Sequence, residues 1–285
     1  MKPSPFDYLD PATVDEVLDL LAEMGDDAVV LAGGQSLIPL LNLRLAAPSV
    51  VISPRRCAEI RTFSIDATGL DAGALVTAAE LEESTDARSL PGLADSLRNI
   101  GHIQIRNRTT IGGSVAHADP AAELPALLLA LEGTVTLRSR ARGTRVMSAD
   151  DFLVGPLISA REPDELLTRV NLPRFAGDVV VGEIGDRPGD FATVGTVVGR
   201  PHTGAATHRI VVFGAGGRAQ RITRAERLAD EGASVDEVVT AVRNDTEATG
   251  DAHASADYRR HVAGTLVGRA LRGGSGSTST TGERR

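Results

Sequence analysis

Short strands and short helices follow one another along this chain without the regular strand–helix–strand alternation that builds a doubly wound sheet. A helical pattern at Val14–Leu21 is followed by a strand-like run at Ala28–Ala32. A second helical pattern at Leu37–Leu45 is followed by another strand-like run at Val50–Ile52. This order predicts an α+β fold, and 285 residues are enough for about two domains.

A break in the pattern at Pro173–Gly177 divides the chain. Three predicted strands and then three predicted helices follow it. They are the strands Val179–Val181, Val194–Val198 and Arg209–Phe213 and the helices Arg224–Ala229, Val235–Val242 and Ala256–Leu271. We therefore expect a separate C-terminal α+β domain over residues 178–272 and, from its Gly, Ser and Thr content, a disordered tail over residues 273–285.

The charge and the single cysteine exclude several classes of protein. A net charge of −8 does not attract nucleic acid or an anionic membrane surface. Cys57 alone cannot close a disulfide within the chain or hold an iron–sulfur cluster. No apolar run approaches the roughly 18 residues of a membrane span, and the N-terminus lacks a signal-peptide pattern. The sequence predicts a cytoplasmic protein without a membrane span.

Two pairs of glycines give the first indication of a ligand. Gly33-Gly34 directly follows the buried strand Ala28–Ala32, and Gln35 and Ser36 come next. Glycine lets the backbone approach a ligand closely, and successive free N–H groups at such a turn favour phosphate oxygens. For one such pair alone, a plain tight turn is the alternative explanation.

The second pair lies in Thr110-Ile111-Gly112-Gly113-Ser114, inside a stretch without helical or strand pattern, Gly101–Asp119. Its flanking hydroxyl groups can also bond phosphate. Glu123 follows at the start of a predicted helix, Pro120–Leu131, where its carboxylate either accepts hydrogen bonds from a ribose or only favours the helix dipole. Two hydroxyl-flanked glycine pairs suggest a diphosphate held between two separate loops.

Other candidate sites are weaker. Arg209–Ala219 fits a strand followed by G-x-G-x-x-A, but no second strand ends in an acid about 20 residues further on, as a dinucleotide-binding fold requires. We interpret Gly214–Gly217 as a hairpin-like turn. His117 and Asp119 lack a third metal ligand nearby, so no metal site is predicted. No nucleophile–base pair is visible, which suits a chain whose cofactor carries the chemistry, and no catalytic residue is predicted.

The order of the motifs adds specificity. They are Ala32-Gly33-Gly34-Gln35-Ser36, Gln104-Ile105-Arg106-Asn107-Arg108, Thr110-Ile111-Gly112-Gly113 and Ala118-Asp119-Pro120-Ala121-Ala122-Glu123-Leu124-Pro125. In this order they resemble the FAD-binding (medium) subunit of molybdenum hydroxylases, the family of carbon monoxide dehydrogenase and xanthine dehydrogenase. The resemblance extends from Phe6 to about Leu271 and includes Arg187–Ala192 and Ala254–Arg259.

The resemblance implies an FAD-binding domain of the vanillyl-alcohol-oxidase (PCMH) type over residues 1–175, with subdomains at about 1–55 and 56–175. A C-terminal domain of the carbon monoxide dehydrogenase flavoprotein type would follow. In that family both glycine loops contact the FAD diphosphate, and an acid at the position of Glu123 lies near the adenosine ribose. Ile100 and Gly101 correspond to residues beside the flavin ring, and Leu167 to a further contact near the cofactor. The residues implied to bind FAD are Leu31, Ala32, Gly33, Gly34, Gln35, Ser36, Leu37, Ile100, Gly101, Thr110, Gly112, Gly113, Ser114, His117, Glu123 and Leu167.

The resemblance also implies the function and the partners. The chain would pass electrons from the iron–sulfur clusters of a small subunit through FAD to an external acceptor. A large subunit would hold the molybdenum cofactor, in a dimer of heterotrimers. The alternatives are an interaction protein that kept the fold but lost the flavin, and an NAD-dependent dehydrogenase that uses Gly214–Gly217.

Three differences from the family pattern concern the flavin-ring side. Thr109 stands where the family often has Gly, Asp186 stands where it has a second Arg, and no Lys lies near Glu183.

Overall fold

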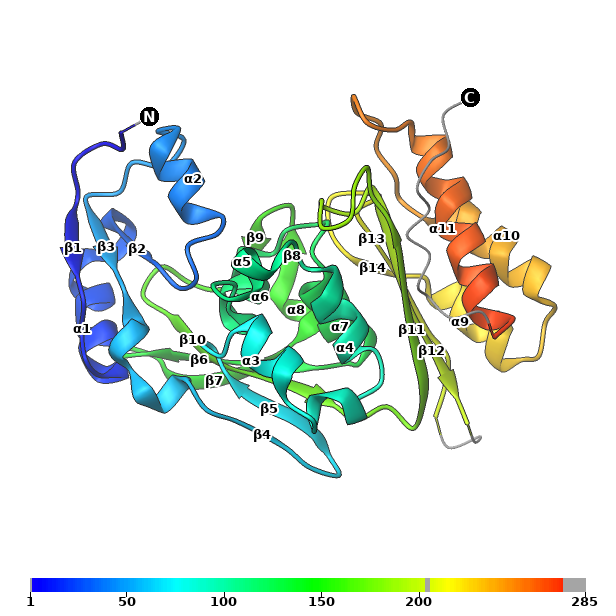
Figure 1. Ribbon diagram of the computed structural model, residues 1–285, viewed down its shortest axis with the longest axis horizontal. Helices are drawn as coiled ribbons and strands as arrows, with labels where there is room; N and C mark the ends of the chain where they lie inside the picture. Colours follow the sequence, from blue (N-terminus) through cyan, green and yellow to red (C-terminus); the bar gives the residue numbers. More distant parts are fainter. Residues whose placement is uncertain (1, 203–205, 274–285) are drawn as a thin grey trace.

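The computed structural model describes residues 2–202 and 206–273, and three units lie side by side in it (Figure 1). The N-terminal unit contains a parallel sheet with strand order β1-β3-β2. Its elements are β1 (Asp7–Leu9), α1 (Val14–Met24), β2 (Ala28–Val30), α2 (Leu37–Asn42) and β3 (Val50–Ile52). A capping box between Thr13 and Glu16 begins α1, whose buried face packs into the small core of this unit.

The middle unit is built on an antiparallel sheet with strand order β4-β5-β10-β6-β7. Its helix α7 is buried at every residue, because it lies between this unit and the C-terminal sheet. The strands are β4 (Phe63–Ile65), β5 (Gly69–Gly73), β6 (Thr134–Ser139), β7 (Gly143–Ser148), β8 (Leu153–Gly155), β9 (Ile158–Ser159) and β10 (Leu166–Pro173). The helices are α3 (Ala78–Glu83), α4 (Leu93–Asn99), α5 (Ile103–Arg106), α6 (Ile111–His117), α7 (Glu123–Ala130) and α8 (Ala149–Phe152).

The C-terminal unit is an antiparallel sheet in sequence order, β11 to β14, with three helices on one face (Figure 1). Successive side chains of a strand point to opposite faces, so alternate residues join different cores. Val179 and Val181 join the core with α4 and α7, whereas Val180 and Ile184 pack toward the C-terminal helices. The elements are β11 (Gly177–Ile184), β12 (Val194–Pro201), β13 (Arg209–Phe213), β14 (Gln220–Arg221), α9 (Thr223–Asp230), α10 (Val235–Asp245) and α11 (Ala256–Leu271).

The predicted α+β fold is confirmed, and the three strands and three helices expected after the break are present. The expectation of an irregular stretch at Gly101–Asp119 is wrong, because α5 and α6 lie within it. Two adjacent glycines disfavour a helix by propensity, but the packing and capping of α6 override that preference. Of the predicted tail, residues 274–285 lie outside the described residues.

Candidate functional site

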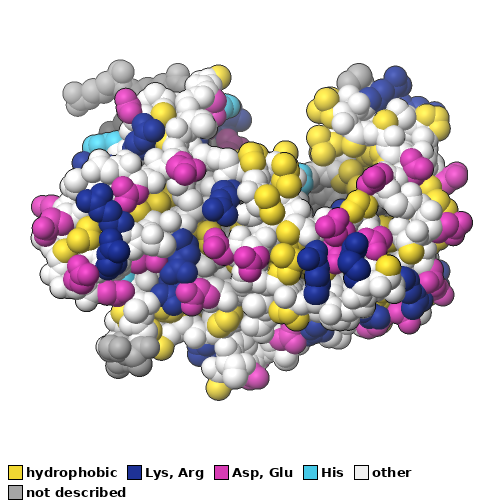
Figure 2. All heavy atoms as spheres, turned by 180° about the vertical axis from the view of Figure 1, so that it is seen from behind, with side chains coloured by type: hydrophobic (Ala, Val, Ile, Leu, Met, Phe, Trp, Pro, Cys, Tyr) yellow, Lys and Arg dark blue, Asp and Glu magenta, His cyan; other side chains and the backbone are white. Residues whose placement is uncertain are grey.

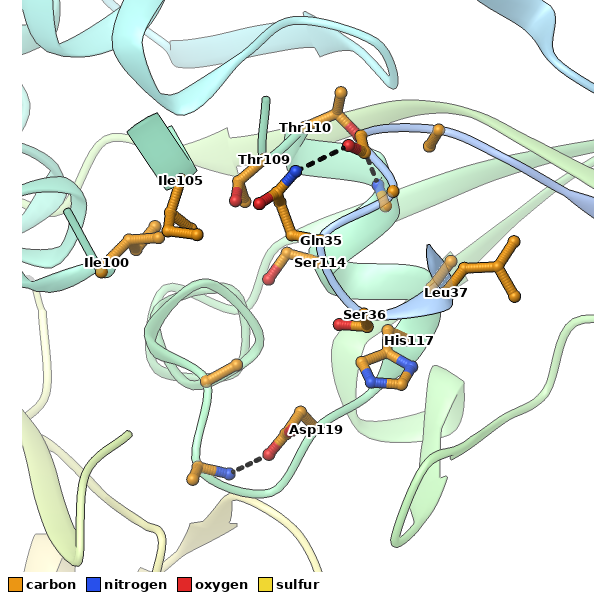
Figure 3. A pocket seen from close by; sticks show the side chains of 18 of the residues that line it. Gln35, Ser36, Leu37, Ile100, Ile105, Thr109, Thr110, Ser114, His117 and Asp119 are labelled. Atoms are coloured by element: carbon orange, nitrogen blue, oxygen red, sulfur yellow. Dashed lines mark hydrogen bonds between the residues drawn. The ribbon is translucent and has the colours of Figure 1, made fainter. Parts of the chain in front are cut away.

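A cavity of about 1040 Å³ lies where the three units meet, and each of them contributes part of its lining. This volume is at the upper end of the range of about 300–1,000 Å³ found for cofactor and ligand pockets. Figure 3 shows that side chains from the α2 and α6 segments, Gln35, Ser36, Ser114 and His117 among them, surround one space. The two glycine pairs, which are far apart in the sequence, therefore meet at one site.

The first glycine segment, residues 32–37, offers a continuous set of backbone donors. No described residue accepts a hydrogen bond from the N–H groups of Ala32 to Leu37, and all of these residues line the cavity. Gly34 has a φ of 77°, a left-handed conformation that glycine adopts without strain. The Gln35 Nε2 atom donates to the carbonyl of Gly33 at 3.1 Å and ties the turn together (Figure 3). Donors without acceptors along a turn form a site for an anion such as a diphosphate.

The second glycine segment, residues 110–114, forms the start of a helix. The prediction of a loop at these residues is therefore wrong. Gly112 and Gly113 lie in the first turn of α6, whose N-cap is Thr110. The N–H groups of Ile111 and Gly112 donate to the carbonyls of Val76 and Ala74, both at 2.9 Å. The Gly113 N–H donates to Thr110 Oγ1 at 3.1 Å. The first donors of this helix are therefore satisfied by the protein itself.

The two glycine segments pack directly on each other. A Cβ atom at Gly33 would overlap the carbonyl oxygen of Arg108, and one at Gly112 would overlap the side chain of Ala74. A Cβ atom at Gly113 would lie 3.2 Å from the Cβ of Ala32. Glycine is thus required at these positions by the close approach of backbone to backbone, in addition to any contact with a ligand.

Two acidic side chains lie at or next to the C-terminal sheet: Glu123 lines the cavity, whereas Glu183 of β11 is half-buried and is not part of the lining. Glu123, at the first position of α7, is 6% exposed and lines the cavity. Burial, and then the negative charge of Glu183, raise the pKa of Glu123 to about 8. Burial raises the pKa of Glu183 to about 7. Asp119 lies nearby and accepts a hydrogen bond from the Ala121 N–H at 2.9 Å (Figure 3).

The C-terminal unit closes the cavity through Arg259, which is 5% exposed. Its Nη1 atom donates to the carbonyls of Thr193 and Gly214, both at 2.5 Å, and its Nη2 atom donates to Asp251 at 2.6 Å. Backbone hydrogen bonds from Ala254 and His253, together with Arg259, lower the pKa of Asp251 to about 2. Arg259 therefore holds together the turns that form this wall.

Ile100 and Gly101 form another part of the cavity wall, beside the loop before β12, whose residues Asp186 and Asp190 also line the cavity. Leu167 and Phe191 also line the cavity, and the Phe191 side chain is exposed at 66%. A Cβ atom at Gly189 would lie 3.0 Å from the backbone of Gly101, so the loop before β12 packs against this part of the wall.

The arginines of the cavity lining donate hydrogen bonds to atoms of the protein. Arg161 donates to the carbonyls of Glu162 and Glu165, both at 2.9 Å, and Arg259 is bound as described above. The described lining residues include no lysine. Among the described residues, Arg161 donates only through its Nη1 atom and forms no ion pair, and the Nε atom of Arg259 is buried without a partner, so these guanidinium groups remain candidate donors to an anion beside the backbone N–H and hydroxyl groups.

The sequence-predicted site residues come together with one exception. Leu31 does not line the cavity; it packs behind the turn, where its Cδ1 atom would lie 3.2 Å from a Cβ at Gly34. The others, from Ala32–Leu37, Ile100, Gly101, Thr110, Gly112–Ser114, His117, Glu123 and Leu167, all line it.

Residues of the C-terminal wall were missed as site residues. They are Phe191, Thr193, Gly214, Asp251, His253 and Arg259. Several of them lie in or next to two motifs of the family resemblance, Arg187–Ala192 and Ala254–Arg259. These motifs could have indicated the C-terminal wall of the site.

The alternative sites lack support. Gly214–Gly217 connects β13 to the antiparallel strand β14, as predicted for a hairpin-like turn, and a Cβ atom at Gly216 would overlap the carbonyl of Glu247. Among residues 2–202 and 206–273, no group of three or more His, Cys, Asp or Glu side chains is placed to hold a metal. Within the same ranges, no helix is long and apolar enough to cross a membrane.

Comparison with known families shows matches over nearly the whole chain. Residues 4–175 match the model of the FAD binding domain in molybdopterin dehydrogenase. Residues 184–273 match the model of the CO dehydrogenase flavoprotein C-terminal domain.

Curated relatives align over most of their length. The chain is 39% identical to the 6-hydroxypseudooxynicotine dehydrogenase complex subunit alpha of Paenarthrobacter nicotinovorans, over 95% of each chain. It is 32% identical to the carbon monoxide dehydrogenase medium chain of Hydrogenophaga pseudoflava, over 95% of this chain and 97% of the relative.

A solved structure has the same fold. A chain of quinoline 2-oxidoreductase from Pseudomonas putida 86 superposes with a TM-score of 0.88 at 35% identity, covering 96% of this chain and 98% of the other. The fold described above is therefore shared with chains of known dehydrogenase and oxidoreductase complexes.

Proposed function

This chain belongs to the family of FAD-binding medium subunits of molybdenum hydroxylase-type dehydrogenases, and we propose that it relays electrons from an iron–sulfur partner to an external acceptor through its FAD. In these complexes the molybdenum and iron–sulfur cofactors belong to other subunits. When bound, FAD supplies electron-transfer chemistry that the side chains of this chain lack. The residues of this chain would then bind the cofactor, exclude water from it and leave one edge of the flavin accessible to redox partners.

The observation that carries the proposal is the run of free backbone N–H groups at residues 32–37. They lie in a cavity whose described lining contains no lysine and whose two arginines, Arg161 and Arg259, donate to protein carbonyls, and they fit the oxygens of a diphosphate. We assign the diphosphate to this turn, with the hydroxyl groups of Ser36 and Ser114 beside it. The adenosine ribose would lie toward Glu123, and the flavin ring toward Ile100, Gly101 and Leu167.

The partners and the domain division follow the same proposal. We propose an iron–sulfur small subunit and a molybdenum-cofactor large subunit in a dimer of heterotrimers, with the domains at residues 1–175 and 178–272. Relatives are named as medium chains or subunits of complexes, which supports a heteromeric assembly.

The surface has apolar areas of the kind that a subunit interface covers. Figure 2 shows hydrophobic side chains along the upper edge of the middle of the molecule and on the facing flank of the N-terminal lobe. Exposed hydrophobic residues include Ile38, Leu43 and Leu45, in or just after α2 of the N-terminal unit, and Val154, Leu157 and Ile158, in or between β8 and β9 of the middle unit.

Purification of the full-length tagged chain from its own cells tests the proposal. We expect flavin absorbance near ~450 nm and co-purification of an iron–sulfur and a molybdenum subunit identified by mass spectrometry. Reduction of a dye acceptor by the complex should stop when FAD is stripped and return when FAD is added. A colourless chain that cannot be reconstituted with FAD would instead identify an interaction protein that has kept only the fold.

A further inference from the structure

Arg161 is a cation of the cavity lining whose guanidinium group has no carboxylate partner among the described residues. Its Nη1 atom donates to three carbonyls of its own segment, those of Glu162 at 2.9 Å, Pro163 at 3.4 Å and Glu165 at 2.9 Å. Its Nε and Nη2 atoms donate to none of the described residues. The guanidinium group is therefore anchored at one nitrogen and free along its Nε–Nη2 edge.

The acids next to Arg161 are bound to other arginines. The Glu165 carboxylate, which is 1% exposed, accepts hydrogen bonds from the Nε and Nη2 atoms of Arg145 at 2.7 and 2.8 Å. The Asp164 carboxylate pairs with Arg142. Burial lowers the pKa of Arg161, and the acids of its segment oppose that effect, but a guanidinium group keeps its charge at any ordinary pH. A positive charge without a directly bound carboxylate therefore remains at the cavity wall.

The position of Arg161 relates this charge to one side of the cavity. The chain runs from Glu165, whose carbonyl accepts from Arg161, into Leu166 and Leu167 of β10, and all four residues line the cavity. Leu167 lies on the wall toward which the flavin ring is proposed to lie. The diphosphate is assigned instead to residues 32–37, which offer free N–H groups of their own. Arg161 thus adjoins the ring side of the proposed FAD site.

A negative charge arises on the ring when FAD is reduced. The ring takes up two electrons and one proton; the proton binds at its N5 atom, and the negative charge spreads over its N1 atom and C2 carbonyl. The electrons come from the iron–sulfur partner of the proposed function, and the proton comes from water. Other ionisable groups of the lining would repel the new charge, among them the side chains of Asp119, Asp186 and Asp190. A cation at the ring side would offset that repulsion.

We propose that Arg161 contacts the flavin ring and stabilises its reduced, anionic form, with the Nε–Nη2 edge donating to the N1 atom and the C2 carbonyl. This rests on the proposed placement of FAD. Two parallel donors in a planar fork suit two neighbouring acceptors. Because the oxidised ring is neutral, the contact favours reduced over oxidised FAD and raises the midpoint potential of the bound cofactor.

Spectroelectrochemical titration of the FAD-loaded full-length chain tests the proposal. In Arg161→Gln the Kd for reduced FAD should rise at least about tenfold relative to the Kd for oxidised FAD, because a charge-assisted contact is lost. Each tenfold factor lowers the midpoint potential of a two-electron couple by about 30 mV. Arg161→Lys keeps the charge but not the fork, so its potential should fall by less.

Arg174→Gln is the matched control. Arg174 is half-buried like Arg161 and also donates to backbone carbonyls, those of Asp66 and Ser89, but it lies outside the described cavity lining. We expect this variant to keep the wild-type midpoint potential. An equal fall of the potential in Arg174→Gln and Arg161→Gln would overturn the proposal.

A second measurement needs no variant. The near-ultraviolet absorption of the reduced wild-type complex at neutral pH should be that of an anionic reduced flavin, and a neutral reduced flavin would overturn the proposal. So would a wild-type potential in Arg161→Gln, even with weaker FAD binding, since equal loss for both redox states indicates a diphosphate contact or a purely structural role. A wild-type chain that binds no FAD would contradict the proposed function as well.

Discussion

The two glycine segments, residues 32–37 and 110–114, both contain adjacent glycines near a serine, but their backbones have different structures. In residues 32–37 the backbone N–H groups have no acceptor among the described residues, and the chain forms an open turn before the short helix α2. In residues 110–114 the first N–H groups of α6 are bonded to Val76, Ala74 and Thr110. A glycine pair followed by a hydroxyl residue therefore does not define an anion site; the free donors do.

The difference assigns different tasks to the two segments. In the proposed placement of FAD, the first would bind the anionic part of the cofactor, and the second supports that turn by close packing of Gly113 on Ala32. Substitutions in the first segment should act on FAD affinity, whereas those in the second should act mainly on folding stability.

Among these variants, Gly33→Val is expected to weaken FAD binding most. The new side chain would overlap the carbonyl oxygen of Arg108 and displace the turn, so the donors leave their positions. Loss of two charge-assisted hydrogen bonds, at about 1.5–3 kcal/mol each, predicts a Kd for FAD at least about 100-fold higher in fluorescence titration.

Gly155→Val is the matched control. A Cβ atom at Gly155 would have no neighbour within 4 Å, and the residue has no positive φ, so FAD binding should remain close to wild type. Retention of stoichiometric FAD by Gly33→Val would remove the first segment from the site.

A pair of smaller substitutions separates the two segments. The Ser36 hydroxyl makes no capping hydrogen bond, so Ser36→Ala should weaken FAD binding roughly three- to tenfold and change stability by less than about 0.5 kcal/mol. Thr110 caps α6, so Thr110→Ala should lower the free energy of unfolding by about 0.5–2 kcal/mol. Urea unfolding and FAD titration of both variants measure the two effects. The reverse pattern would mean that the roles of the two segments have been exchanged.

Salt concentration is expected to have the smallest effect on FAD affinity. Since Arg259 is paired with Asp251, Arg161 donates to protein carbonyls and the turn would bind through N–H groups, the Kd for FAD should change less than about threefold between 0.05 and 0.5 M NaCl. A steep decrease in affinity would reveal a cationic side chain that moves onto the diphosphate when FAD binds.

Much of the site could be predicted from the sequence because its elements are local. A strand that ends in Gly33-Gly34, and an acid at the start of a helix, are visible as short patterns. The strands and helices of the C-terminal unit also have clear periodicity. Their predicted positions agree with the structure to within a few residues at most ends.

What could not be predicted depends on contacts between distant segments. The helix at Ile111–His117 forms despite two glycines because its donors meet Val76 and Ala74, about 35 residues earlier in the chain. The role of Arg259 depends on carbonyls at Thr193 and Gly214, which no local pattern links to it. The raised pKa of Glu123 depends first on its burial, between elements of two units, and then on Glu183, on a strand of another unit.

Amide hydrogen exchange of the full-length chain, with and without saturating FAD, tests the difference between the two glycine segments most directly. We predict that FAD slows exchange at residues 32–37, whose N–H groups are free without it, and leaves Ile111, Gly112 and Gly113 nearly unchanged. New protection confined to residues 111–113, with residues 32–37 exchanging freely in the presence of FAD, would contradict this account.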